Sequence, residues 1–103
     1  MNERDLDVLN ILFQSKEPMM ATDIVFTGKK GLTQSTVTAV LRKLLNDELV
    51  EVVGVTHSGK VLSRTYRPTE KAKEVILEHF LNQYSLFKDV IPPKEMCSAI
   101  KKL

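Results

Sequence analysis

Residues 33–46, TQSTVTAVLRKLLN, followed by the segments LVEVVGV at 49–55 and VLSRTYR at 61–67, decide the fold of this chain. The first segment has apolar residues at helical spacing, namely Val37, Val40, Leu41, Leu44 and Leu45. Its other face is polar or basic, with Gln34, Ser35, Thr38, Arg42 and Lys43. Such a helix can bury one side and present hydrogen-bonding groups on the other. The two following segments alternate like strands, and Ser58-Gly59 between them is a good hairpin tip.

Further helices are expected on both sides of this unit. Apolar residues at helical spacing predict helices at 3–15 and 21–27, and the second is separated from residues 33–46 by the turn Gly28-Lys29-Lys30-Gly31. Thr33 is a suitable N-cap, and Leu32 and Val37 stand at the positions of a hydrophobic staple. A long helix is expected from Glu70 to Lys88, and a last one after Pro92-Pro93. The predicted fold is α+β and mostly α: a winged helix-turn-helix domain at 1–68, with C-terminal helices at 69–103 as a dimerisation region.

Composition limits the class of protein. With 103 residues, 43% of them hydrophobic and 27% charged, the chain is expected to form one folded domain rather than a disordered segment. No apolar run approaches the roughly 20 residues that span a bilayer, so no membrane association is expected. The single cysteine, Cys97, cannot form an internal disulfide, and this favours a cytoplasmic location.

The net charge of +2 is small, but the charges are unevenly distributed. Residues 1–28 hold two basic and five acidic side chains, whereas residues 29–67 hold seven basic and three acidic ones. The positive excess therefore lies in the turn, the helix at 33–46 and the hairpin. A local basic face on a nearly neutral protein is typical of a polyanion-binding domain and favours double-stranded DNA as the partner.

The candidate DNA contacts follow from how a helix reads the major groove, with its N-terminal half against the base edges. Gln34 suits adenine, and Thr38 or Ala39 suits a thymine methyl group. Arg42 suits a phosphate or a guanine, and the lysines and Arg64 suit phosphates or a minor groove. The full candidate set is Lys29, Lys30, Gln34, Ser35, Thr36, Thr38, Arg42, Lys43, Lys60 and Arg64.

Other interpretations of the same residues remain open. Thr33 is a cap more readily than a base contact, and Arg42 with Lys43 is also compatible with a solvated helix face. Winged folds serve as protein–protein modules too, so the alternative function is an interaction module in a larger assembly. A metal- or ligand-responsive regulator is a third interpretation.

The C-terminal third indicates a homodimer. The helix at 70–88 carries more apolar surface than one side of a small domain needs, and a second amphipathic helix follows. The alternative is that both helices fold back on their own core. The residues expected at the dimer interface are Ile76, Phe80, Tyr84, Phe87, Met96 and Ile100.

Enzymatic and metal sites have little support in the sequence. There is no nucleophile elbow, no phosphate-binding glycine loop and no paired carboxylates in an apolar run, so no catalytic residue is assigned. His57, His79, Asp89 and Cys97 have none of the usual metal-ligand spacings. No cofactor and no metal are expected.

The chain resembles the penicillinase- and methicillin-resistance repressors and the related copper-operon repressors. The resemblance covers about three-fifths of the chain, from Leu6 to Tyr66, and is carried by the segments VLNILF at 8–13, ATDIV at 21–25, TQSTVTAVLRKL at 33–44, LVE at 49–51 and SRTYRP at 63–68. It implies a homodimer that binds an inverted-repeat operator and represses transcription. By position it implies that Ser35, Thr36, Thr38 and Arg42 lie near DNA. The copper repressors carry several C-terminal cysteines, whereas this chain has Cys97 alone.

Overall fold

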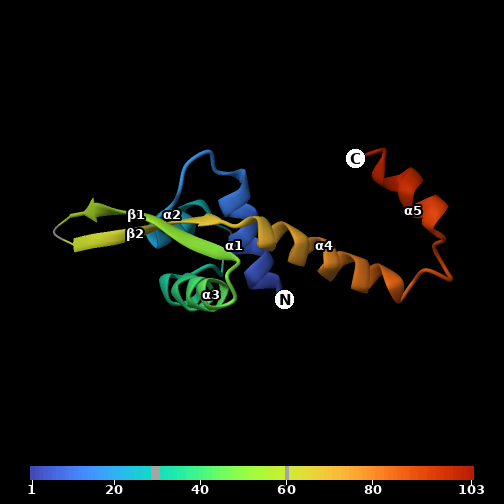
Figure 1. Ribbon diagram of the computed structural model, residues 1–103, viewed down its shortest axis with the longest axis horizontal. Helices are drawn as coiled ribbons and strands as arrows, with labels where there is room; N and C mark the ends of the chain where they lie inside the picture. The colour runs from blue at the N-terminus through green and yellow to red at the C-terminus, as the bar shows by residue number, and fades with distance from the viewer. Residues whose placement is uncertain (29–30, 60) are drawn as a thin grey trace.

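The computed structural model describes residues 1–28, 31–59 and 61–103, and its elements follow the expected order (Figure 1). They are α1 (Glu3–Gln14), α2 (Ala21–Thr27), α3 (Gln34–Asn46), β1 (Val50–Ser58), β2 (Val61–Pro68), α4 (Glu70–Ser85) and α5 (Pro93–Ile100). Three helices followed by an antiparallel hairpin make a winged helix-turn-helix, so the predicted α+β, mostly α fold is confirmed. The two C-terminal helices extend from it.

Local hydrogen bonds fix where the helices begin. The Thr33 hydroxyl accepts a hydrogen bond from the Thr36 amide at 3.2 Å, which confirms Thr33 as the N-cap of α3. At α1, the Asn2 side chain accepts from the Asp5 amide, while the Asp5 carboxylate accepts from the Asn2 amide. Met20 lacks a capping side chain, but its amide donates to the Asp23 carboxylate at 3.1 Å.

The end of α3 is a Schellman motif built without glycine. The Leu49 amide donates to the Leu44 carbonyl at 2.8 Å, and the Glu48 amide donates to the Leu45 carbonyl at 3.1 Å. Glu48 has φ 62°, a left-handed conformation that is costly for a residue with a Cβ. This turn directs the chain from α3 into β1.

The core lies between the three helices and the base of the hairpin. The predicted apolar seam of α3 is buried at four of its five positions, and Leu45 is half-buried. The buried hydrophobic residues are Val8, Leu9, Leu12, Ile24, Leu32, Val37, Val40, Leu41, Leu44, Leu49, Val50 and Ala72. Since most of these lie on α1 and α3, these two helices hold the domain together.

The hairpin is longer than the sequence indicated. Its first strand was expected at 49–55, but β1 runs on to Ser58 because Thr56, His57 and Ser58 pair with β2. The register shifts between Val52 and Gly54. The hairpin is fixed to the helices where Met19 and Tyr66 exchange two backbone hydrogen bonds, of 3.0 and 2.8 Å. Beyond that point it projects away from the helices (Figure 1).

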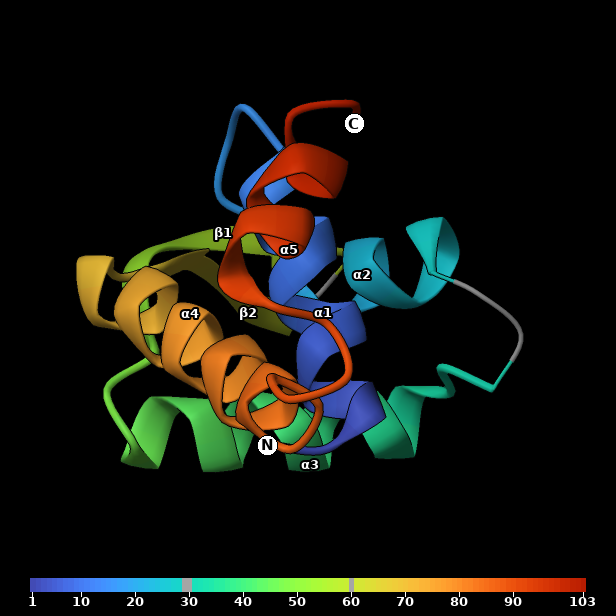
Figure 2. The ribbon, with the colours of Figure 1, turned by 90° about the vertical axis from the view of Figure 1, so that its right-hand side faces the viewer.

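Helix α4 leaves the domain on the side opposite the hairpin tip, and α5 turns back from its far end (Figures 1 and 2). The helix expected up to Lys88 ends at Ser85, because its last amides bond three rather than four residues back, from Phe87 to Tyr84 at 2.8 Å. The molecule measures 56 × 26 × 23 Å. Within the described ranges, no helix is both long and apolar enough to cross a membrane. We call α4 and α5 together the C-terminal arm.

Candidate nucleic-acid interface

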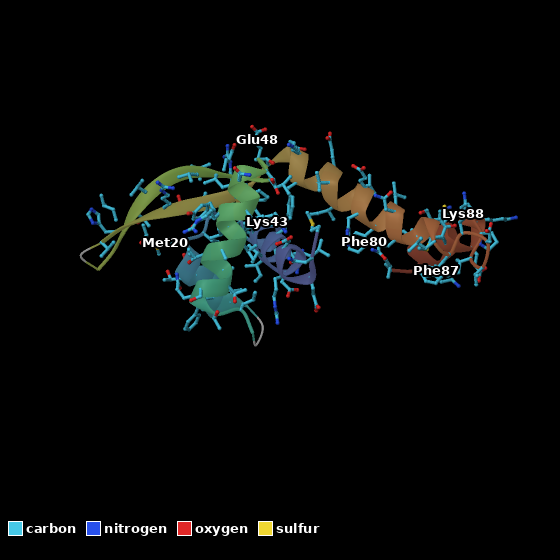
Figure 3. All side chains as sticks on the ribbon, turned by 90° about the horizontal axis from the view of Figure 1, so that it is seen from below. Met20, Lys43, Glu48, Phe80, Phe87 and Lys88 are labelled. Atoms are coloured by element: carbon cyan, nitrogen blue, oxygen red, sulfur yellow. The ribbon has the colours of Figure 1, made fainter. Side chains whose placement is uncertain are left out.

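The outer face of α3 is a polar surface opposite the buried seam. Ser35, Thr38, Ala39 and Arg42 are all exposed, and their spacing of three, four and seven residues places them on one side of the helix. Helix α3 contains no acidic residue. In Figure 3 this helix crosses in front of the domain, with the hairpin to one side and the arm to the other. The face can therefore approach a polyanion without carboxylates of its own helix in the way.

The two flanks of α3 differ in what they face. On one flank, Gln34 is exposed and points toward the hairpin, where it lines a recess described below. On the other flank, Thr36 is half-buried, and its hydroxyl accepts a hydrogen bond from the Thr33 hydroxyl at 3.0 Å. Of these two predicted contacts, Gln34 thus has the more open side chain.

Lys43 forms an ion pair inside its own chain, although its side chain is 51% exposed. Its Nζ lies 2.7 Å from an oxygen of Asp5, on the side of α3 that faces α1 (Figure 3). This hydrogen bond and the charge of Asp5 raise the pKa of Lys43 above its ordinary value. Asp5 is only 1% exposed, and its other carboxylate oxygen is buried without a partner among the described residues. We therefore interpret Lys43 as the partner of a buried carboxylate that ties α1 to α3.

The two described basic residues of the hairpin, Arg64 and Arg67, differ in whether they form an ion pair. Arg67 forms an ion pair with Glu51 on the neighbouring strand. Arg64 is exposed, lies on the same face of the hairpin as Tyr66, and forms no ion pair with any residue the structure describes. Near the tip, Val55, Val61 and Leu62 are at least 60% exposed, so this part of the wing is more apolar than expected. The predicted contacts Lys29, Lys30 and Lys60 lie outside the described residues.

A recess of about 150 Å³ lies where α2, α3 and the hairpin meet. It brings together side chains that are far apart in the sequence. Its lining residues are Met20, Ala21, Thr22, Gln34, Ser63, Arg64 and Tyr66. Gln34 and Arg64 were predicted as DNA contacts, but Thr22 and Ser63 were not, because isolated hydroxyls in a helix and a strand carry no distinguishing pattern.

A further basic group missed by the sequence analysis lies beside the turn before α3. Gly31 has φ 101°, and a Cβ built on it would lie 2.6 Å from Nη2 of Arg4. The Arg4 guanidinium thus covers this glycine while also contacting Asp7 at 3.4 Å. Helix α1 therefore places a positive charge next to the start of α3, a proximity that only the fold creates.

The C-terminal arm presents an apolar stripe that its own domain leaves uncovered. Ala72 is buried, and Val75 and Ile76 are packed partly against the core, so the root of α4 is fixed. Further along the arm, the predicted interface residues and their apolar neighbours are more than half exposed. The exposed fractions are 61% for Leu77, 55% for Phe80, 55% for Leu81, 54% for Phe87 and 55% for Ile100. Figure 3 shows Phe87 at the far end of the arm, away from the three-helix unit, and Phe80 between the two. The alternative in which these helices fold back on the core is not what the structure shows.

Two of the expected interface residues, Tyr84 and Met96, are only partly exposed. The Tyr84 hydroxyl donates to the Ile91 carbonyl at 2.7 Å and so holds the turn between α4 and α5. Burial, with the nearby Cys97 and Glu95, raises the pKa of Tyr84. Met96 is half-buried. Over the described ranges, no three His, Cys, Asp or Glu side chains are grouped as a metal site would require.

No protein-family model matches this chain, and no curated protein matches it in sequence. Solved structures share its fold, among them the following two. A PadR family transcription regulator from a hypervirulent Clostridium difficile has a TM-score of 0.60 at 19% identity, covering 87% of this chain and 95% of that one. A protein from Archaeoglobus fulgidus has a TM-score of 0.53 at 18% identity, covering 89% and 91%. At these identities the likeness shows the winged helix fold.

Proposed function

We propose that this chain is a transcription regulator that binds double-stranded DNA through the outer face of α3 and the hairpin. The observation that carries the proposal is the exposed, acid-free outer face of α3 beside a projecting wing. A helix of this kind fits the major groove, and a hairpin at its side can reach the neighbouring backbone. The transcription regulator among the structures of like fold is consistent with this function. Ser35, Thr38 and Arg42 are the residues we place at the base edges and phosphates.

We further propose that the regulator is a homodimer joined through its C-terminal arm. A compact chain of this mass exposes about 5900 Å² and has a radius of gyration of about 13 Å. This chain exposes 7760 Å² and has a radius of gyration of 16.2 Å. The excess of about 1900 Å², to which the projecting hairpin also contributes, is of the size that each subunit of an obligate dimer buries, roughly 1000–2500 Å². Two arms packed around a two-fold axis would cover the stripe on both copies.

A dimer of this kind would place two copies of α3 about one DNA turn apart, so the operator is expected to be an inverted repeat. The resemblance to the penicillinase- and methicillin-resistance repressors supports repression as the outcome of binding. We place the protein in the cytoplasm, where DNA and a reduced Cys97 are both expected.

Selection of bound duplexes from a random DNA pool tests the proposal. We expect an enriched inverted repeat whose affinity falls steeply with salt, and we expect Arg42→Ala to weaken binding to it. The matched control is Lys73→Ala, which removes one exposed positive charge from α4 instead. No enrichment from the pool at low salt would refute DNA binding, and a tight protein partner recovered without any footprint on DNA would favour the interaction module instead.

A further inference from the structure

The recess between α2, α3 and the hairpin has the composition of an anion site. Five of its lining side chains can donate hydrogen bonds: the hydroxyls of Thr22, Ser63 and Tyr66, the amide of Gln34 and the guanidinium of Arg64. They come from three different elements, so the fold rather than the local sequence brings them to one place. Figure 3 shows Met20, which also lines the recess, between the hairpin and α3.

The charge around the recess favours an anion. Arg64 is its one charged lining residue among those described, and it has no carboxylate partner there. The carboxylate of Asp23, in the first turn of α2, accepts a hydrogen bond from the Met20 amide and does not line the recess. A guanidinium presented with neutral donors is the usual protein arrangement for phosphate.

The size and position of the recess limit which anions could bind there. Its volume of about 150 Å³ is below the range of about 300–1,000 Å³ typical of sites for whole small molecules. Gln34 is the first residue of α3, so anything held there lies beside the end of the helix that meets base edges. A single group of a longer polyanion fits both observations.

We infer that this recess holds one phosphodiester of the DNA strand that borders the major groove. The inference rests on the proposed function and adds Thr22 and Ser63 to the DNA contacts. Arg64 supplies the charge, and Thr22, Ser63 and Gln34 donate hydrogen bonds to the phosphate oxygens. The contact carries no sequence information by itself; it fixes the depth and register of α3 in the groove.

The test compares variants on the duplex selected from the random pool, over a range of salt concentrations. Arg64→Gln removes one charge from the recess, so the slope of log affinity against log salt should become shallower by about 0.9. Thr22→Val and Ser63→Ala remove donors but no charge, so affinity should fall about tenfold each while the slope stays that of the wild type. The control is Lys94→Gln, which removes an exposed charge from α5 and should change neither the affinity nor the salt slope.

A second measurement locates the phosphate on the DNA. Each phosphate of the duplex is replaced in turn by a neutral methylphosphonate. One position should weaken the wild-type protein clearly more than it weakens Arg64→Gln, which keeps only the uncharged donors. An unchanged salt slope for Arg64→Gln, or methylphosphonate penalties equal to those of the wild type at every position, overturns the inference while DNA binding itself stands. Failure of the wild type to bind any duplex overturns the proposed function instead.

Discussion

Truncating Phe80 should separate the two subunits without unfolding either of them. Phe80 is 55% exposed on α4, and a phenylalanine buries about 200 Å², so about 110 Å² is free to be covered by a partner. At about 25 cal/mol per Å², this area contributes about 2.8 kcal/mol per subunit and about 5.5 kcal/mol per symmetric dimer. The alanine retains some of the contact, so we expect Phe80→Ala to raise the dimer dissociation constant by about 10²- to 10⁴-fold.

Sedimentation equilibrium over a range of protein concentrations measures this constant directly. The matched control is Phe26→Ala, because Phe26 is 94% exposed but lies on α2. It removes the same side chain and should leave the dissociation constant unchanged. Circular dichroism checks that both variants remain folded. Equal dissociation constants for wild type and Phe80→Ala would refute the assignment of the stripe as the dimer contact. A wild type that stays monomeric at about 100 μM would refute it too, because even a Kd of about 10 μM would give mostly dimer at that concentration.

Three further changes test the structural argument. Thr33→Ala removes the hydroxyl that caps the Thr36 amide and should lower the free energy of unfolding by about 1 kcal/mol in urea denaturation, with Thr33→Ser close to wild type. Glu48→Gly relieves a left-handed φ and should raise that free energy by about 1 kcal/mol, whereas Glu48→Ala, which keeps the Cβ, should not. Lys43→Met should be less stable than wild type at neutral pH. Because Asp5 raises the pKa of Lys43 above 10.5, the difference should stay constant from about pH 7 to pH 10.5 and shrink as the pH rises through the higher, folded value. A difference that shrank between about pH 7 and 9 would point to another group.

Local pattern was enough to predict most of the elements. The apolar spacing of α3 and the Thr33 cap are each contained within a few neighbouring residues, and both are confirmed. The residues at which the elements end were less predictable. Strand β1 runs on to Ser58 because it pairs with β2, and a pairing partner is not visible in the strand's own alternation.

The candidate interface was only partly predictable because its geometry depends on contacts between distant residues. The Lys43–Asp5 ion pair joins residues 38 positions apart, and nothing about Lys43 on its helix distinguishes it from Arg42. The recess combines Thr22 with Ser63 and Arg64, which meet only when the hairpin is fixed by the Met19–Tyr66 bonds. Periodicity identifies which face of a helix is polar, but not what lies opposite that face.

Because the arm is separate from α3, the proposed DNA contact and the proposed dimer contact should affect binding to different duplexes. Arg42 lies on α3 and Phe80 on α4, and they share no hydrogen-bond or ion-pair partner among the described residues, so their effects within one subunit should be independent. On an inverted repeat they become linked, because a joined second subunit binds its half-site at a high effective concentration. Arg42→Ala should therefore weaken binding to a single half-site and to the full repeat alike. Phe80→Ala should weaken binding to the full repeat only, since a lone half-site never required the second subunit. Equal loss on both duplexes for Phe80→Ala would mean that the arm contributes to DNA contact itself rather than to joining the subunits.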